Sequence, residues 1–196
     1  MPSPDLVLGE DAVSRCGWVG TDTDYIRYHD TEWGVPLLGD QKLFEKLSLE
    51  AFQAGLSWIT ILKRRPGFRD AFSDFDVKTV AAYTEADIDR LMKDESIIRN
   101  RAKIQATITN AQIVHTMVGS TPGAFHDLVW SFQPAAAPRT RPQHLADVPA
   151  VTDESTRLSA TLKSLGFRFV GPTTMYALMQ SAGLVDDHLE GCWRAA

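Results

Sequence analysis

The chain contains only two cysteines; a histidine follows the first and another precedes the second, and the 13-residue spacing of the first pair is not a known zinc-finger pattern. His188 and Cys192 lie four residues apart in VDDHLEGCW, so on a helix their side chains would share one face. Cys16 and His29 lie 13 residues apart (29 − 16), which suits two arms of a folded N-terminal segment. Two thiolates and two imidazoles fit tetrahedral zinc with no open position. The set indicates a structural zinc site that joins the N-terminal segment to a C-terminal helix; alternatively, the cysteines are buried apolar residues and the histidines are incidental.

A carboxylate interrupts the apolar stretch LEAFQAGLSW, where Glu50 precedes Ala51 and Phe52. A carboxylate among apolar residues must be paired, hydrogen-bonded or functional, because burying it alone is costly. Aromatic residues occur close to this stretch or near the N-terminus: Trp18, Tyr25, Tyr28, Trp33 and Trp58. A pocket of rings with one carboxylate suits a flat, electron-poor ligand. Ordinary core packing around a hydrogen-bonded glutamate is the alternative.

Two glycines, Gly166 and Gly171, flank a predicted turn between two apolar helical segments. Backbone N–H groups at the start of a helix can bind phosphate oxygens, and Thr173 and Thr174 could add hydroxyl donors. The pattern fits a phosphate-binding hairpin, or a plain turn between helices.

Length and composition limit the class of protein. The 196 residues are 44% hydrophobic and 23% charged, enough for one sizeable core. No apolar run approaches the ~18 residues that span a bilayer, and the N-terminal residues lack the features of a signal peptide. We therefore expect a cytoplasmic protein without a membrane partner, with a flexible tail over residues 1–12 and a single helical domain over residues 13–196. Thiols stay reduced in that compartment, so a disulfide is not expected.

The net charge of −5 argues mildly against a nucleic-acid partner. Phosphate binding needs only a local basic surface, however, and basic residues cluster at 63–65 and between 99 and 103. Solvated faces are the alternative for both clusters.

The hydrophobic pattern is helical over nearly the whole chain. TEAD at 84–87 resembles a capping box, and the Pro- and Ala-rich residues 133–150 predict a loop. No segment shows the alternation of a strand, so the sequence predicts an all-α fold. The expected helices run from Leu43 to Gly55, from Ser57 to just before Pro66, from Thr84 through Leu91, along Ile104 and Ile108 to Gly119, over GAFHDLVWSF, and from Thr152 through Leu165.

The ordered segments closely resemble the bacterial 3-methyladenine DNA glycosylase I family from about Arg15 to Trp193. The segments are CGWVG, DYIRYHDTEWGVP, LFEKLSLEAFQAGLSWITILKRR, DESIIRNRAKIQATITNA, LVWSF and LKSLGFRFVGPTTMYALMQSAGLVDDHLEGC. The resemblance implies a two-lobed helical fold of the helix-hairpin-helix DNA glycosylase superfamily, with the hairpin around residues 158–183. It also implies a monomeric, monofunctional enzyme that hydrolyses the N-glycosidic bond of 3-methyladenine in double-stranded alkylated DNA. The products would be 3-methyladenine and an abasic site.

The resemblance assigns a role to each candidate residue. Cys16, His29, His188 and Cys192 would hold one structural Zn²⁺ per chain. Glu50 would be the catalytic residue, with Tyr28 and Trp58 binding the base and Trp18, Tyr25 and Trp33 completing an aromatic wall. Leu56, assisted by Gln53, would fill the gap that the base leaves in the DNA, and Gly166, Gly171, Thr173 and Lys163 would meet phosphates.

The implied mechanism follows from the charge of the base. N3-methylation makes adenine cationic, so the base leaves neutral and needs no strong general acid. An ionised Glu50 would accept hydrogen bonds from the adenine edge, while the rings stack on the cation.

Two positions depart from the family pattern. Ala51 replaces a glycine, and Asp186 stands where the superfamily has a catalytic aspartate but this family commonly has an amide. Asp186 would stabilise the sugar cation, or only pack or cap a helix.

Two other classes of protein fit part of these observations. A non-catalytic nucleic-acid-binding module held by zinc would explain the hairpin and the basic clusters, but not a carboxylate within an aromatic set. A small-molecule-binding protein would explain the aromatic pocket, but not the hairpin. Release of free base from methylated DNA discriminates the three classes.

Overall fold

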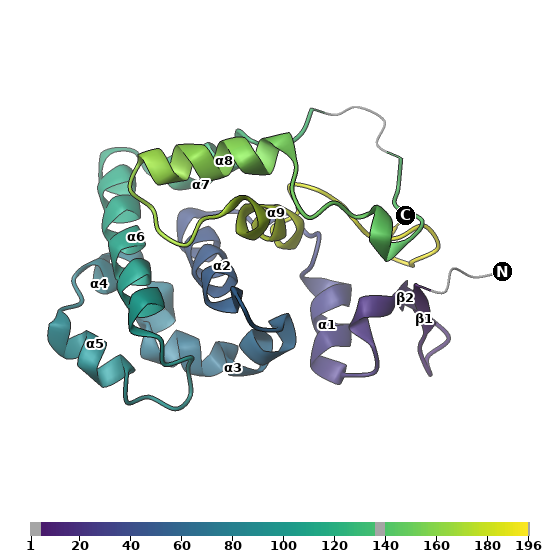
Figure 1. Cartoon of the computed structure of the whole chain (residues 1–196), viewed down its shortest axis with the longest axis horizontal. Helices are drawn as coiled ribbons and strands as arrows, with labels where there is room; N and C mark the ends of the chain where they lie inside the picture. Colours follow the sequence, from purple (N-terminus) through teal and green to yellow (C-terminus); the bar gives the residue numbers. More distant parts are fainter. Residues whose placement is uncertain (1–4, 136–139, 196) are drawn as a thin grey trace.

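The computed structural model of the protein describes residues 5–135 and 140–195, and over these residues the chain is mostly helical (Figure 1). The α-helices are α1 Thr23–Thr31, α2 Asp40–Gln53, α3 Trp58–Ala71, α4 Val77–Ala81, α5 Glu85–Leu91, α6 Arg101–Ser120, α7 Ala124–Trp130, α8 Asp153–Ser164 and α9 Pro172–Ser181. The shorter elements are β1 Leu6–Leu8, β2 Ser14–Cys16, η1 Gly17–Val19, η2 Ser73–Phe75 and η3 Leu145–Asp147. None of the helices in this part of the chain is long and apolar enough to cross a membrane.

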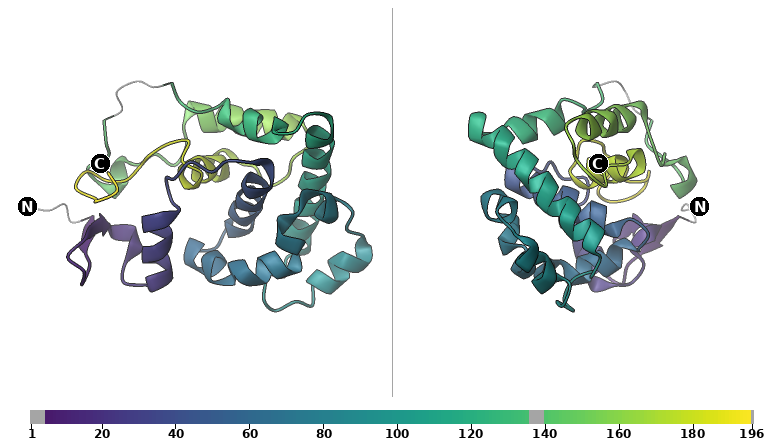
Figure 2. Two further views of the ribbon diagram at one scale, coloured as in Figure 1. Left: turned by 180° about the vertical axis from the view of Figure 1, so that it is seen from behind. Right: turned by 60° about the vertical axis from the view of Figure 1, so that its left-hand side comes forward.

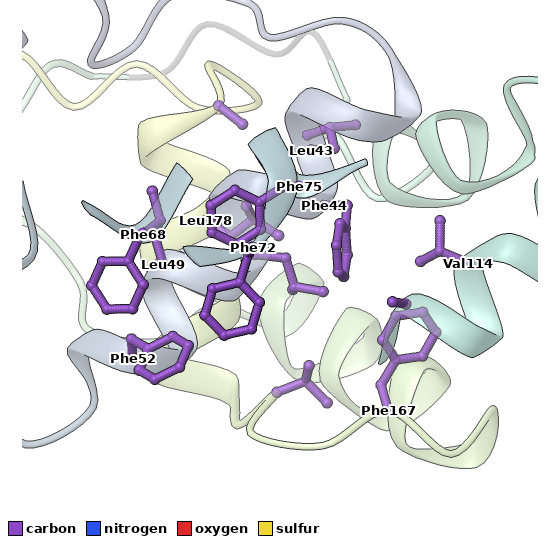
Figure 3. Close-up of a cluster of buried hydrophobic side chains, with 14 of the residues drawn as sticks. Leu43, Phe44, Leu49, Phe52, Phe68, Phe72, Phe75, Val114, Phe167 and Leu178 are labelled. Carbon is purple, nitrogen blue, oxygen red and sulfur yellow. The ribbon is translucent and has the colours of Figure 1, made fainter. Parts of the chain in front are cut away.

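Helix α2 lies at the centre of the hydrophobic core. It packs against α3, α6, α7 and α9, and its residues Leu43 and Phe44 are fully buried. Figure 3 shows the aromatic part of this core, in which the rings of Phe52 and Phe68 lie 4.7 Å apart. Because α2 is surrounded by other helices, the backbone that carries Glu50 is held rigidly.

Side-chain caps begin several helices as the sequence predicts. The N–H of Thr84 donates to Asp87 Oδ2 (2.8 Å), so the predicted capping box is present. Thr152 Oγ1 accepts from the N–H of Ser155 (3.3 Å) at the start of α8. Ser57 takes the N-cap position of α3, but its hydroxyl contacts another hydroxyl and not a backbone N–H.

The helix end predicted before Pro66 is wrong, because α3 continues through Pro66 to Ala71. A proline inside a helix removes one N–H donor and costs about 3 kcal/mol or more. Buried Ile61, Leu62 and Phe68 lie on either side of Pro66 and anchor α3 in the core. Tertiary packing therefore outweighs the local signal.

The two ends of the described chain lie side by side (Figure 1 and Figure 2). Strands β1 and β2 pair antiparallel with Leu6 opposite Cys16, and the N–H of Trp193 donates to the carbonyl of Ser14 (2.9 Å). This small sheet is an exception to the all-α prediction, and β1 falls inside the segment expected to be a flexible tail. Three-residue strands are too short to show an alternating pattern in sequence.

The predicted loop over 133–150 lies partly outside the described residues, which omit 136–139. In its described part, η3 is the only regular element. The loop brings Leu145 and Val148 from η3 and its end beside the aromatic residues of the N-terminal segment.

Helices α8 and α9 form the predicted hairpin, and a buried amide from α6 holds its turn. Asn110 Nδ2 donates to the carbonyl of Arg168 (3.1 Å), and the N–H of Arg168 donates to Asn110 Oδ1 (2.8 Å). Ser159 Oγ donates to the carbonyl of Val170 (2.6 Å). Gly166 has a φ of +97°, a conformation that favours glycine. The hairpin turn is therefore fixed to α6 by Asn110 and to α8 by Ser159.

Candidate functional site

The two cysteines and two of the histidines converge where the chain ends meet. Cys16, His29, His188 and Cys192 are buried, and one potential ligand atom of each lies within 4.8 Å of the others. Cys192 Sγ lies 3.4 Å from His29 Nε2 and 3.7 Å from His188 Nδ1. Tetrahedral bonds of ~2.3 Å to sulfur and ~2.0 Å to nitrogen would place such atoms roughly 3.5 Å apart. The cluster can therefore hold a metal ion.

His188 and Cys192 do not lie on a helix, contrary to the prediction. Helix α9 ends at Ser181, and a turn with Gly191 at φ +86° brings the two side chains together. The N–H of Cys192 donates to the carbonyl of Leu189 (2.9 Å), and the N–H of Leu189 donates to Cys16 Sγ (3.3 Å). The two ligands thus meet through a backbone turn that also holds the N-terminal cysteine.

Contacts to the remaining ring nitrogens orient both imidazoles. His29 Nδ1 lies 2.8 Å from Asp30 Oδ1, and His188 Nε2 lies 3.2 Å from the carbonyl of Trp33. Asp30 is held in turn by Arg15. The other nitrogens, His29 Nε2 and His188 Nδ1, face the sulfurs. This is the arrangement in which histidine binds a metal through one nitrogen and donates from the other.

The surroundings of the two thiols stabilise a thiolate. The hydrogen bond between the two sulfurs is the main cause that lowers the pKa of Cys192. Both imidazoles also bond to Cys192 and favour its thiolate. Since the thiolate is the form that binds metal, the surroundings already favour one anionic ligand.

A cavity of about 350 Å³ opens next to this cluster. Its volume falls in the range of small-ligand pockets. The N-terminal segment, α1, α2, α3, α9 and η3 all contribute side chains to it. Its walls are aromatic (Trp18, Tyr25, Tyr28, Trp33, Trp58), polar (Glu50, Gln53, Gln180, Ser181, Asp187) and small or aliphatic (Leu145, Val148, Ala177). All five predicted aromatic residues, the predicted carboxylate and Gln53 surround one cavity.

Glu50 is a buried carboxyl in this wall. It is 4% exposed, and Ser181 Oγ donates to its Oε1 (2.8 Å). Burial raises the pKa of Glu50 to about 7, although the charge of Lys46 and the bond from Ser181 oppose the rise. The implied mechanism uses an ionised Glu50, which stays a prediction; burial in the wall favours the protonated form. A cationic ligand in the cavity would favour the charged form.

The rings of the wall contact one another and the metal-binding cluster. Tyr28 and Trp58 lie 5.4 Å apart at 46°, and Trp18 packs edge-on against Trp33 (5.1 Å). The ring of Trp33 also lies 4.6 Å from that of His188. Within the described chain, the buried Trp58 Nε1 has no hydrogen-bond partner. The cavity therefore offers aromatic faces for stacking.

A second carboxylate of the cavity comes from Asp187, which the sequence analysis did not identify. Asp187 is buried, and it accepts from the Tyr176 hydroxyl (2.6 Å) and Gln180 Nε2 (2.8 Å). Its neighbour Asp186 is exposed, pairs with Arg141 (3.0 Å) and does not line the cavity. The two adjacent aspartates cannot be told apart by residue type; only the conformation of the segment shows which one turns inward.

Leu56 lies at an exposed turn beside the cavity and is 42% exposed. Gly55 precedes it with a φ of +83°, and the N–H of Leu56 donates to the carbonyl of Gln53 (2.6 Å). Lys103, part of a basic cluster in the sequence, is buried and donates to the carbonyls of Phe52 (2.8 Å) and Ala54 (2.6 Å). These bonds fix the end of α2 and the turn that presents Leu56.

The predicted phosphate-binding residues lie at the exposed end of the hairpin. Lys163, Gly166 and Thr173 are exposed, and Gly171 is the N-cap of α9 without a side-chain cap. A Cβ at Gly171 would meet nothing within 4 Å, so the backbone there is open to a ligand.

Lys63 and Arg65 of the basic cluster at 63–65 form ion pairs with acidic side chains of the same chain. Lys63 pairs with Asp22 (2.6 Å), and Arg65 pairs with Glu32 (2.5 Å). These pairs fix α3 to α1 and to the segment that follows α1. The hairpin is therefore the better candidate for contact with phosphates.

Comparison with known proteins places this chain in a family. The family model for methyladenine glycosylase matches residues 18–195. DNA-3-methyladenine glycosylase 1 of Escherichia coli (strain K12) is 48% identical over 180 residues, which cover 92% of this chain and 96% of that protein. A crystal structure of 3-methyladenine DNA glycosylase I superposes with a TM-score of 0.87 at 47% identity, covering 91% of this chain and 98% of that chain. A variant of another such enzyme, solved in complex with 3-methyladenine, gives a TM-score of 0.85 at 38% identity, covering 91% and 96% of the two chains.

Proposed function

The chain belongs to the methyladenine glycosylase family, and from this membership we infer that it is an enzyme that hydrolyses the N-glycosidic bond of 3-methyladenine in alkylated DNA. The observation that carries the inference is a buried carboxyl, Glu50, in a cavity walled by five aromatic side chains. A neutral purine gains little from a carboxylate there. A cationic, methylated purine gains both from the carboxylate and from the ring faces.

The positive charge of the methylated base makes it a good leaving group. A 3-methyladenine nucleotide is cationic, so the base leaves neutral and the sugar becomes an oxocarbenium-like cation. The enzyme must extrude the base, which costs less for a damaged base than for an intact one. Tyr28 and Trp58 then supply the stacking faces. Glu50 accepts hydrogen bonds from the adenine edge, and the cationic base shifts its carboxyl toward the ionised form.

Water completes the reaction at the sugar carbon, and we assign Asp187 to stabilise the sugar cation. Its support is position: Asp187 lines the cavity, whereas Asp186 points outward to Arg141. The lysine nearest in sequence to Glu50, Lys46, does not line the cavity. The absence of a lysine from the described lining favours a monofunctional enzyme that leaves an abasic site.

Double-stranded DNA is the proposed partner, with Leu56 in the gap left by the base. Gln53 at the cavity edge is proposed to assist it. The hairpin, through Gly166, Gly171, Thr173 and Lys163, is proposed to bind the phosphate backbone. A monomeric state and a cytoplasmic location are proposals of the same kind.

Cys16, His29, His188 and Cys192 are proposed to hold one Zn²⁺ per chain. Bound zinc would supply a closed, four-ligand cross-link between the chain ends. The ligand residues themselves orient the cavity, because Trp18 and Trp33 pack against His29 and His188.

The function is tested by release of free base from methylated duplex DNA. The wild-type protein is expected to release 3-methyladenine and to leave abasic sites without cutting the strand. Glu50→Gln is expected to be 10–100-fold slower, since a charge-assisted hydrogen bond contributes about 1.5–3 kcal/mol. Glu45→Gln is the matched control: it lies on the same helix, pairs with Arg69 and does not line the cavity, so excision should be unchanged.

Failure to release any methylated base would reject the glycosylase assignment. Equal excision by Glu50→Gln and wild type would reject only the role of Glu50. For the metal, elemental analysis should find one zinc per chain. A stably folded protein with far less than one equivalent of metal would contradict that proposal.

A further inference from the structure

A buried lysine lies just behind the aromatic cavity. Lys46 sits one helical turn before Glu50 on α2 and is 6% exposed. Its Nζ lies 4.9 Å from the ring centroid of Tyr28 and 5.4 Å from that of Trp58. Both rings line the cavity, but Lys46 itself lines a separate hollow of about 300 Å³ on the other side. The ammonium therefore contacts two of the ring systems of the cavity without reaching into it.

No direct ion pair neutralises this lysine among the residues that the structure describes. The acidic side chains of its hollow are engaged elsewhere, Glu32 by Arg65 (2.8 Å) and Glu45 by Arg69 (2.7 Å). The ring faces and the more distant carboxylates are what stabilise the charged form. Burial lowers the pKa of Lys46, and Glu50 and Glu32 oppose that change.

A structural role explains this residue poorly. Among side chains of similar length, methionine would fill the same space without the cost of a buried charge. The lysine places a positive charge in the core, one helical turn from the buried carboxyl of Glu50, and this charge favours the carboxylate. Charges four residues apart on a helix are neighbours, and low-dielectric surroundings strengthen their interaction.

We propose that Lys46 is a positioning residue that favours the ionised form of Glu50 from behind the aromatic rings of the cavity. The effect of Lys46 on excision rests on the proposed function, whereas its interaction with Glu50 does not. Without Lys46, fewer molecules would carry the carboxylate that binds the cationic base. The enzyme would then lose activity at neutral pH and regain it when the medium is alkaline enough to ionise Glu50.

Other charged groups could also set the ionisation of Glu50. Around Glu50 these are Tyr25 and Tyr28 from α1 and Asp187 after α9. None of them is a cation, so none supplies a positive charge that would favour the carboxylate.

The groups that face Lys46 come from several elements: Glu32 after α1, Lys42 and Glu45 from α2, and Arg65 and Arg69 from α3. Both arginines are already paired with glutamates. Lys46 is the buried cation closest to the carboxyl in sequence.

Lys46→Met tests the proposal, because it replaces the lysine by an unbranched side chain of similar length and removes the charge. Lys42→Met is the matched control, one turn earlier on the same helix and exposed. Single-turnover excision of 3-methyladenine is measured from pH 5.5 to 9. In the pH–rate profile of Lys46→Met, the rise in rate on the acid side should occur about one pH unit higher than in wild type. Excision at pH 7 should then be roughly fivefold slower than in wild type and should recover at pH 9. Lys42→Met should move this rise by less than about 0.3 pH units.

A direct titration separates this proposal from the proposed function. The ¹³C signal of the Glu50 carboxyl, identified by its loss in Glu50→Gln, reports ionisation without any reaction. Its midpoint should move with the rise in rate on the acid side. An unshifted midpoint in a folded Lys46→Met protein would overturn the proposal even if excision is normal, whereas a shifted midpoint in a protein that excises nothing would overturn the proposed function alone.

The wild-type protein provides a further check in case Lys46→Met does not fold. The ¹³Cε and ¹⁵Nζ signals of Lys46 should be those of an ammonium at pH 7. A neutral amine there would refute the proposal outright, because an uncharged lysine cannot favour a carboxylate.

Discussion

Replacing Glu50 by glutamine should make the protein more stable at alkaline pH while slowing excision. Burial raises the pKa of Glu50 from 4.5 to about 7, so the folded state binds this proton more tightly than the unfolded state does. The free energy of unfolding therefore falls as the pH rises from about 4.5 to about 7, and the full loss remains above that. Glutamine has no charge to bury and can still accept the hydrogen bond from Ser181.

The size of the gain follows from the shift. A difference of about 2.5 pKa units (7 − 4.5) corresponds to about 3 kcal/mol at pH 8.5 and to less than about 1 kcal/mol at pH 5. This is an upper limit, because Glu50→Gln also removes a partner of Lys46. For a chain of this length, about 3 kcal/mol raises Tm by roughly 6–12 °C.

The assay is thermal and urea unfolding of wild type, Glu50→Gln and Glu45→Gln at pH 5 and pH 8.5. The difference between two proteins at one pH cancels the titration of all groups that they share. Glu45 is partly exposed and ion-paired, so Glu45→Gln should show no gain that grows with pH. A Glu50→Gln protein no more stable than wild type at pH 8.5 would refute the reasoning, since the carboxylate would then not be costly in the folded state.

Three further variants test the remaining parts of the site. Asp187→Asn should slow excision about tenfold or more, whereas Asp186→Asn should leave it nearly unchanged; equal effects in single-turnover assays would contradict the assignment of Asp187. Leu56→Ala should weaken binding to an abasic-site duplex about tenfold by fluorescence anisotropy while leaving binding of free 3-methyladenine intact, and a parallel loss of both would place Leu56 in the core. Cys192→Ala should lower the metal content and reduce the unfolding free energy by more than about 3 kcal/mol, against unchanged values for the exposed His115→Ala.

The metal-binding cluster could be predicted from the sequence because cysteine is rare in this chain. With two cysteines in the chain, any histidine near each of them stands out. The conformation was harder to predict: spacing of four residues suggested a helix, but a turn at Gly191 gives the same proximity. The spacing of two residues in the sequence limits how far apart their side chains can lie, but it does not determine the backbone conformation between them.

Other features of the site depend on tertiary contacts that no local pattern carries. Asn110 holds the hairpin turn from another helix, and Lys103 does the same for the end of α2. Pro66 predicts a helix end, yet packing carries α3 through it. The sequence shows a lysine, Lys46, one helical turn from Glu50 on an apolar face. Only the structure shows that its ammonium contacts the rings of Tyr28 and Trp58.

The order of residues in the chain couples the metal-binding cluster to the cavity. Trp18 follows Cys16 by two residues, Tyr28 immediately precedes His29, and Asp187 immediately precedes His188; all three non-ligands line the cavity. A metal that fixes the ligands therefore also fixes the backbone of three cavity walls. These walls come from both ends of the chain, which single hydrogen bonds also join in the described structure, such as those from the N–H of Trp193 to the carbonyl of Ser14 and from Trp193 Nε1 to Asp30 Oδ1. Fraying of either end would displace side chains that line the cavity. A metal cross-link between the ends would thus contribute to binding of the base by holding the rings at stacking distance, through residues that never touch the base.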